Sequence, residues 1–70
     1  MPYVNLKLYP GRTDEQKREA ARRIIEVVTD ICRVAPGADF PVVIEEVAPD
    51  DWKATIGPEV EAKAANRYDQ

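Results

Sequence analysis

The sequence predicts a small α/β (α+β) protein built on one β-α-β unit, with two parallel strands and one main helix between them. Three observations lead to this fold class: an alternating segment near the start, an amphipathic segment at helical spacing, and a β-branched run after it. Because the chain has 70 residues, we expect a single domain over residues 1–70. Its core is expected at residues 2–48 and a C-terminal tail at 49–70.

The first strand is predicted over Pro2–Tyr9, where apolar and polar side chains alternate. One face of this strand carries valine and leucine, and the other carries tyrosine, asparagine and lysine. Pro10-Gly11 follows and is expected to end the strand.

The main helix is predicted to begin at about Asp14, because Thr13 and Gln16 form a capping box. Apolar residues then recur three and four positions apart, with charged residues on the opposite side. The apolar stripe is Ala20, Ala21, Ile24, Ile25, Val28, Ile31 and Cys32. Cys32 is interpreted as a small hydrophobe within this stripe, without a catalytic role. Pro36-Gly37 is expected to end the helix.

The second strand is predicted over Phe40–Val47, a β-branched run that ends at Pro49-Asp50-Asp51. A right-handed crossover between two parallel strands places the helix on one face of the sheet. Such a sheet leaves strand edges and apolar surface open, so we expect it to continue into a second copy. In the tail, a short helix is predicted over residues 58–65, with Pro58 in its first turn.

The composition limits which functions are possible. With 44% hydrophobic and 33% charged residues and no long apolar run, the chain predicts a cytoplasmic protein without a membrane partner. A net charge of −3 argues against binding to nucleic acid. One cysteine and no histidine argue against a disulfide, most zinc sites, and serine or cysteine triads. The expected partners are a small molecule and further copies of the chain.

Pro2 is the candidate catalytic residue, because it directly follows the initiator methionine. Removal of Met1 gives an N-terminal secondary amine, whereas retention of Met1 leaves an amide nitrogen without basicity. An α-amino group has a reference pKa of about 7.7 to 8.0, and nearby cations or apolar surroundings favour its neutral, basic form. The alternative is a Met-Pro start without a chemical role, since proline is common at strand starts.

Three features together resemble the 4-oxalocrotonate tautomerase family. They are Pro2 at the start of a short strand, the stretch Gly11-Arg-Thr-Asp-Glu-Gln-Lys17 before one amphipathic helix, and the second strand. The resemblance runs from Pro2 to about Trp52. It implies β-α-β protomers that form a four-stranded sheet across a dimer and often assemble into hexamers. It also implies that Pro2 transfers a proton within a small enol acid, with no metal or organic cofactor.

The resemblance implies substrate-binding roles for two further residues. Arg12 matches the family arginine that binds the substrate carboxylate, and a guanidinium suits this task through two parallel hydrogen bonds. Trp52 falls near the position of an aromatic residue that walls the site. Without the family, Arg12 can also be a solvated arginine before a helix, and Trp52 can pack in an oligomer interface.

The chain departs from the family pattern at the start of the second strand. The best-known members carry a second arginine there that polarises the substrate carbonyl, whereas this chain has Phe40-Pro41. Lys53 or Lys7 could supply the positive charge near the substrate carbonyl, although a lysine lacks the planar guanidinium that forms two parallel hydrogen bonds. This departure favours a monoacid such as an arylenolpyruvate over a dicarboxylated dienol. The tail lacks the close glycine repeat of hexameric members, which leaves both dimer and hexamer open.

The leading hypothesis is an isomerase that catalyses keto-enol tautomerisation by 1,3- or 1,5-proton transfer, with Pro2 as general base and acid. Two alternatives stay open. In the first, the same fold hydrolytically dehalogenates a haloacrylate, with Pro2 as proton donor and Glu45 or Glu46 activating water. In the second, the chain is a non-catalytic oligomeric interaction module whose charged helix faces a partner.

Overall fold

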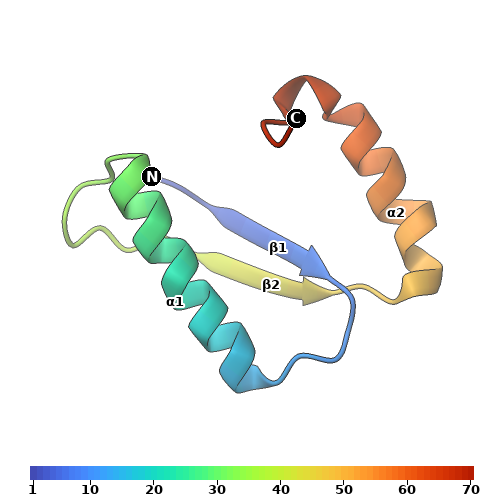
Figure 1. Ribbon diagram of the computed structural model, residues 1–70, viewed down its shortest axis with the longest axis horizontal. Helices are drawn as coiled ribbons and strands as arrows, with labels where there is room; N and C mark the ends of the chain where they lie inside the picture. Colours follow the sequence, from blue (N-terminus) through green and yellow to red (C-terminus); the bar gives the residue numbers. More distant parts are fainter.

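The computed structural model describes residues 1–70 as two parallel strands and two helices (Figure 1). In chain order the elements are β1 (Val4–Leu8), α1 (Asp14–Ile31), β2 (Val42–Glu46) and α2 (Pro49–Ala62), with a 3-10 turn at Ala64–Asn66. Val4 lies opposite Val42 in the parallel pairing, and Leu8 lies opposite Glu46. The predicted β-α-β arrangement is confirmed.

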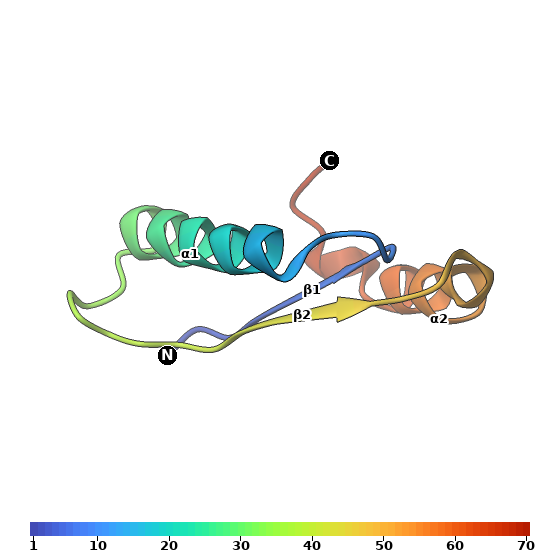
Figure 2. The same ribbon diagram turned by 90° about the horizontal axis from the view of Figure 1, so that it is seen from below.

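α1 covers one face of the sheet and begins where the sequence predicts (Figure 2). The Thr13 hydroxyl accepts a hydrogen bond from the Gln16 N–H at 3.1 Å. The Gln16 side chain in turn accepts from the Thr13 N–H at 2.9 Å. This capping box satisfies amide groups that have no partner within the helix, and it therefore fixes where α1 starts.

α1 ends at Ile31, before the predicted stop signal. Cys32 is the C-cap, and Arg33 adopts a φ of 55°, in the left-handed region. The Val34 N–H donates to the Thr29 carbonyl at 3.2 Å, which is the hydrogen bond of a Schellman motif. Ile31 and Cys32, which were expected to pack in the apolar stripe, are exposed at this helix end.

α2 begins earlier than predicted and is longer. The sequence suggested a helix over residues 58–65, whereas α2 starts at Pro49 and ends at Ala62. Proline is favoured in a first helical turn because its missing N–H would have no partner there, and the two aspartates that follow suit the positive end of the helix dipole. Pro58 lies inside the helix. Neither helix is both long and apolar enough to cross a membrane.

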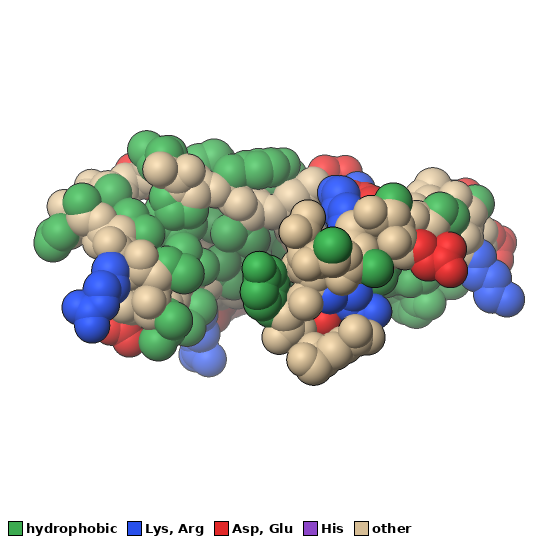
Figure 3. Space-filling view, turned by 90° about the horizontal axis from the view of Figure 1, so that it is seen from above, with side chains coloured by type: hydrophobic (Ala, Val, Ile, Leu, Met, Phe, Trp, Pro, Cys, Tyr) green, Lys and Arg blue, Asp and Glu red, His purple; other side chains and the backbone are tan.

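The chain buries little surface by itself. Phe40, 3% exposed, is the one buried residue, and hydrophobic side chains lie open across the β-α-β part (Figure 3). The radius of gyration is 13.9 Å, against about 11 Å for a compact chain of this length. The accessible surface of 5725 Å² exceeds the value of about 4,400 Å² expected for a folded monomer of this mass. A single copy therefore buries less surface than a compact folded monomer of the same size.

The outer edge of β1 is unpaired. The sheet has two strands, and the Val4 N–H donates to the Pro41 carbonyl at 3.1 Å, so Val4 turns its main chain toward β2. Main-chain groups alternate in direction along a strand, so those of Asn5 and Lys7 point away from β2. β1 therefore presents a row of free donors and acceptors on its outer side.

Candidate active site

The residues singled out from the sequence lie at the two ends of β1. Pro2 precedes the strand, whereas Arg12 follows it in the turn to α1, and Trp52 lies in the first part of α2. β1 alone spans about 13 Å, at about 3.3 Å per residue. One copy of the chain therefore brings Arg12 and Trp52 together and leaves Pro2 apart from them.

Arg12 and Trp52 line one shallow, open cavity of about 200 Å³, together with Lys7, Leu8 and Tyr9. The rings of Tyr9 and Trp52 meet edge to face, with 4.9 Å between their centroids and 81° between their planes. This contact ties the start of α2 to the end of β1. An arginine, a lysine and two aromatic rings at one place can bind a small acid.

The turn between β1 and α1 determines where Arg12 lies. The Arg12 guanidinium donates to the Tyr9 carbonyl at 2.9 Å. Gly11 has a φ of 122°, which side chains rarely allow, and its N–H donates to a Glu46 carboxylate oxygen at 3.1 Å. Thr13, on the other side of Arg12, caps α1. Arg12 is therefore held between a strand end and a helix start.

Glu46 connects this turn to β2 and to α1. Its second carboxylate oxygen lies 3.0 Å from Lys17 Nζ. The ion pair with Lys17 and the hydrogen bond from Gly11 hold the pKa of Glu46 below its ordinary value, and Arg12 adds to this effect. Sequence reasoning considered Glu46 only as a residue that could activate water. In the structure its charge holds the turn of Arg12.

Glu45 and Glu46 do not reach the cavity of Arg12. Glu45 accepts a hydrogen bond from the Asn5 side chain at 2.9 Å, and both oxygens of Glu46 are occupied by the turn and by α1. Neither residue lines the cavity. No observation therefore favours the dehalogenase alternative, which needs one of these carboxylates beside the substrate.

The structure separates the two lysines that the sequence left open as a source of positive charge. Lys7 lines the cavity with Arg12, its side chain is 31% exposed, and its Nζ lies 3.2 Å from a Glu59 oxygen on α2. Lys53 is exposed and does not line the cavity. Pro41, where the family resemblance leads us to expect an arginine, is also exposed. Lys7 is thus the second cation beside Arg12.

Pro2 lies half-buried at the other end of β1, in an open hollow of about 630 Å³. The other residues of this hollow are Met1, Cys32, Arg33, Val34, Ala35 and Ala38. Met1 is 93% exposed, so the bond between Met1 and Pro2 is accessible. The surroundings of Pro2 are mainly aliphatic and lack a carboxylate.

Comparison with known proteins identifies the family of this chain. Residues 2–64 match a family model described as Tautomerase enzyme. The chain belongs to the tautomerase family. This tautomerase is 43% identical over 47 residues to a Streptococcus agalactiae protein named "Probable tautomerase", covering 67% of this chain and 77% of that protein. No solved structure shows a significant match.

A second relative carries a more specific name. The chain is 42% identical over 55 residues to the 2-hydroxymuconate tautomerase of Bacillus subtilis, covering 74% of this chain and 82% of that protein. The predicted family is therefore confirmed, and the tautomerase is an enzyme of the isomerase class. The interaction-module alternative loses its support.

Proposed function

We propose that this tautomerase moves a proton between carbon and oxygen, or between two carbons, of a small enol acid. In this proposal Pro2 acts as the general base and then as the general acid. Arg12 binds the substrate carboxylate, and the Trp52 ring lines one side of the site. The observation that carries it is the cavity shared by Arg12 and Trp52, in a chain whose family match starts at Pro2. The name of the Bacillus subtilis relative supports an unsaturated hydroxy acid as the substrate class.

A second copy completes the proposed site. Pro2 and Arg12 lie at opposite ends of β1, whose outer edge is unpaired. A two-fold dimer that pairs the two β1 strands antiparallel puts the start of one strand beside the end of the other. Pro2 of one protomer then lies near the partner's Arg12 and the partner's Trp52, and the sheet has four strands.

The surface of the chain supports this dimer. The 5725 Å² of accessible surface is about 1,300 Å² more than a compact monomer of this mass exposes. A standard interface buries about 800 Å² per partner, so the excess is large enough to form one. The same sheet edge can serve a dimer alone or a dimer within a hexamer.

The neutral Pro2 nitrogen takes a proton from the enol oxygen or a carbon of the substrate and returns it at another position, so the base becomes the acid that completes the reaction. Arg12 keeps its charge throughout and holds the carboxylate by two parallel hydrogen bonds. Tyr9 and Trp52 restrict water around the reacting atoms, which strengthens the electrostatic interactions there.

The test is a ketonisation assay on phenylenolpyruvate and 2-hydroxymuconate, with protein whose loss of Met1 is verified by intact mass. Pro2→Ala is expected to lower kcat/KM by about 100-fold, because it replaces the proposed secondary amine with a less basic and less rigidly held primary amine. Protein that retains Met1 is expected to be inactive, since its proline nitrogen is an amide. Unchanged rates in Pro2→Ala contradict the proposal.

Arg12→Ala tests the carboxylate role in the same assay. It is expected to raise KM by about 10-fold or more with a smaller change in kcat, because it removes binding shared by the ground and transition states. Arg18→Ala is the matched control, since Arg18 is exposed on α1 and lines no cavity. An unchanged KM in Arg12→Ala contradicts the carboxylate role.

A further inference from the structure

We propose that Lys7 stabilises the enolate oxygen whose negative charge develops during proton transfer, and that Glu59 positions the Lys7 ammonium. This inference rests on the proposed function. When Pro2 removes the enol proton, the O–H bond breaks and its electron pair stays on oxygen until carbon is protonated. The Lys7 ammonium donates a hydrogen bond to that oxygen and keeps its own protons, so no bond to Lys7 forms or breaks.

The first argument is the position of Lys7. Its side chain lies on the same face of β1 as Tyr9, since the two residues are two apart along the strand. It lies between two pockets: it lines the cavity of Arg12 and Trp52, and it also lines a neighbouring pocket with Glu59. In the proposed function Arg12 binds the substrate carboxylate. The negative charge that develops on the enolate oxygen therefore needs another cation to stabilise it. Lys7 is the one other cationic residue that lines this cavity.

The second argument is that the other lysines have different places. Lys17 lies 3.0 Å from Glu46 and holds the turn before α1. Lys53 on α2 and Lys63 at the end of α2 are exposed, and neither lines the cavity. Lys7, with a side chain that is 31% exposed, is shielded enough for its charge to act on a bound molecule.

The third argument is the charge balance around Glu59. Glu59 lies on α2 and accepts hydrogen bonds from Lys63 at 3.0 Å and from Lys7 at 3.2 Å. Lys63, and then Lys7, hold the pKa of Glu59 below its ordinary value, so the carboxylate is charged. One carboxylate between two ammonium groups leaves a net positive charge. Glu59 can therefore orient Lys7 without neutralising it.

The test compares Lys7→Met, Lys7→Arg and Glu59→Gln with the processed wild type in the ketonisation assay. Lys7→Met keeps the length of the side chain and removes its charge. We expect kcat to fall about 100-fold with KM changed less than about 3-fold, because the lost hydrogen bond acts in the transition state. Lys7→Arg is expected to keep most of the activity. Glu59→Gln is expected to lower kcat about 10-fold, because Lys7 is then less well positioned.

Lys53→Met and Pro2→Ala are the controls, and Lys53→Met is expected to leave kcat unchanged. An unchanged kcat in Lys7→Met, beside a Pro2→Ala that has lost most of its activity, overturns the role of Lys7 and leaves the proposed function intact. A fully active Pro2→Ala overturns the proposed function itself. Equal losses of kcat in Lys7→Met and Lys7→Arg, with lower melting temperatures in both, show a structural role and also overturn the inference.

Discussion

The two ends of β1 differ in how completely a single chain builds them. At the Arg12 end, the turn is held by hydrogen bonds from Arg12 to Tyr9, from Gly11 to Glu46, and within the capping box. At the Pro2 end, Met1 is exposed and the surroundings form an open, mainly aliphatic hollow. The half with the proposed carboxylate-binding residue is thus organised within one chain, whereas the half with the proposed base is left open in a single copy.

The largest expected effect comes from blocking the open edge of β1. The Asn5 N–H points away from β2, so Asn5→Pro removes an edge donor and leaves the β1–β2 hydrogen bonds in place. We expect monomers in sedimentation and a loss of about 1,000-fold in kcat/KM, because Pro2 and Arg12 no longer meet. Asn5→Ala keeps the N–H and is the matched control. An Asn5→Pro variant that stays associated and active contradicts the shared site.

Glu46 tests the organised end of the strand. Glu46→Ala frees the Gly11 N–H and the turn of Arg12, so KM is expected to rise about 10-fold while association is unchanged. Steady-state kinetics on phenylenolpyruvate and sedimentation measure the two effects. Glu45→Ala, one residue away and outside the turn, is the control. If KM in Glu46→Ala equals that of Glu45→Ala, Glu46 does not position Arg12.

The pH dependence of KM gives a second measure of the same contact. Lys17 and Gly11 lower the pKa of Glu46 from 4.5 in the folded state. The contribution of Glu46 to the fold and the turn is therefore complete above pH 4.5 and is lost as the pH falls through the lower, folded-state pKa. We expect KM of the wild type to rise in that acid range. In Glu46→Gln this rise should be absent; its persistence assigns the effect to another group.

The start of α1 is expected to matter for stability more than for chemistry. Thr13→Ala removes the hydroxyl that accepts the Gln16 N–H and should cost about 1 kcal/mol. Thermal unfolding at equal protein concentration should show a melting temperature lower by about 4 to 8 °C. Thr55→Ala is the control, since the Thr55 hydroxyl only donates back to the Asp51 carbonyl within α2. Equal effects in the two variants contradict the role of the cap.

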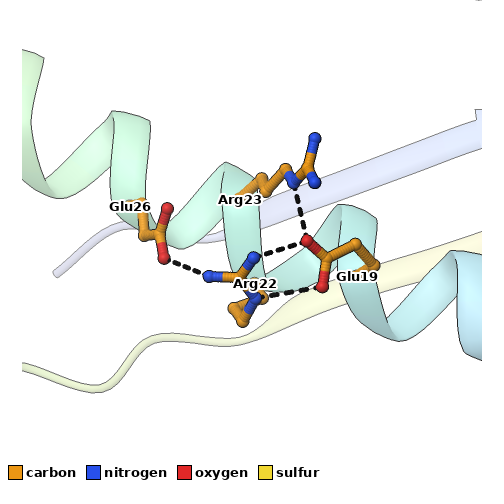
Figure 4. A network of polar contacts seen from close by, with 4 residues as sticks. All are labelled: Glu19, Arg22, Arg23 and Glu26. Atoms are coloured by element: carbon orange, nitrogen blue, oxygen red, sulfur yellow. Dashed lines mark hydrogen bonds and ion pairs between the residues drawn. The ribbon is translucent and has the colours of Figure 1, made fainter.

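The smallest effect is expected on the exposed face of α1, where Arg22 and Arg23 contact Glu19 and Arg22 also contacts Glu26 (Figure 4). Arg22, followed by Arg23, lowers the pKa of Glu19 to about 2. These side chains are solvated, so Arg22→Ala should barely change the melting temperature or kcat/KM at pH 7. Any small difference should disappear in about 1 M salt. A large difference would mean that this face contacts another copy.

The sequence predicted an element correctly wherever the pattern lies within a few neighbouring residues. Alternation predicted β1, and Thr13 with Gln16 predicted the first residue of α1. The end of α1 was missed because Arg33 occupies the left-handed position at which glycine is the usual signal. The start of α2 was missed because Pro49 was interpreted only as the end of the second strand, whereas proline is also common in the first turn of a helix.

The site was predictable only in part for a different reason. Arg12 and Trp52 followed from the family resemblance, and the structure brings them to one cavity. Glu46 and Glu59 were not recognised in their structural roles, because their contacts join residues 35 and 52 positions apart. Such contacts depend on the register of the parallel strands and on the direction of α2, which spacing along the chain does not reveal.

A mixing experiment tests the shared site most directly. Pro2→Ala and Arg12→Ala proteins are unfolded together, refolded as a mixture, and assayed at substrate concentrations well below KM. If each site combines Pro2 of one copy with Arg12 of its partner, mixed dimers contain one intact site, and random pairing restores about a quarter of the wild-type rate. A mixture no more active than the two separate variants contradicts a site shared between copies.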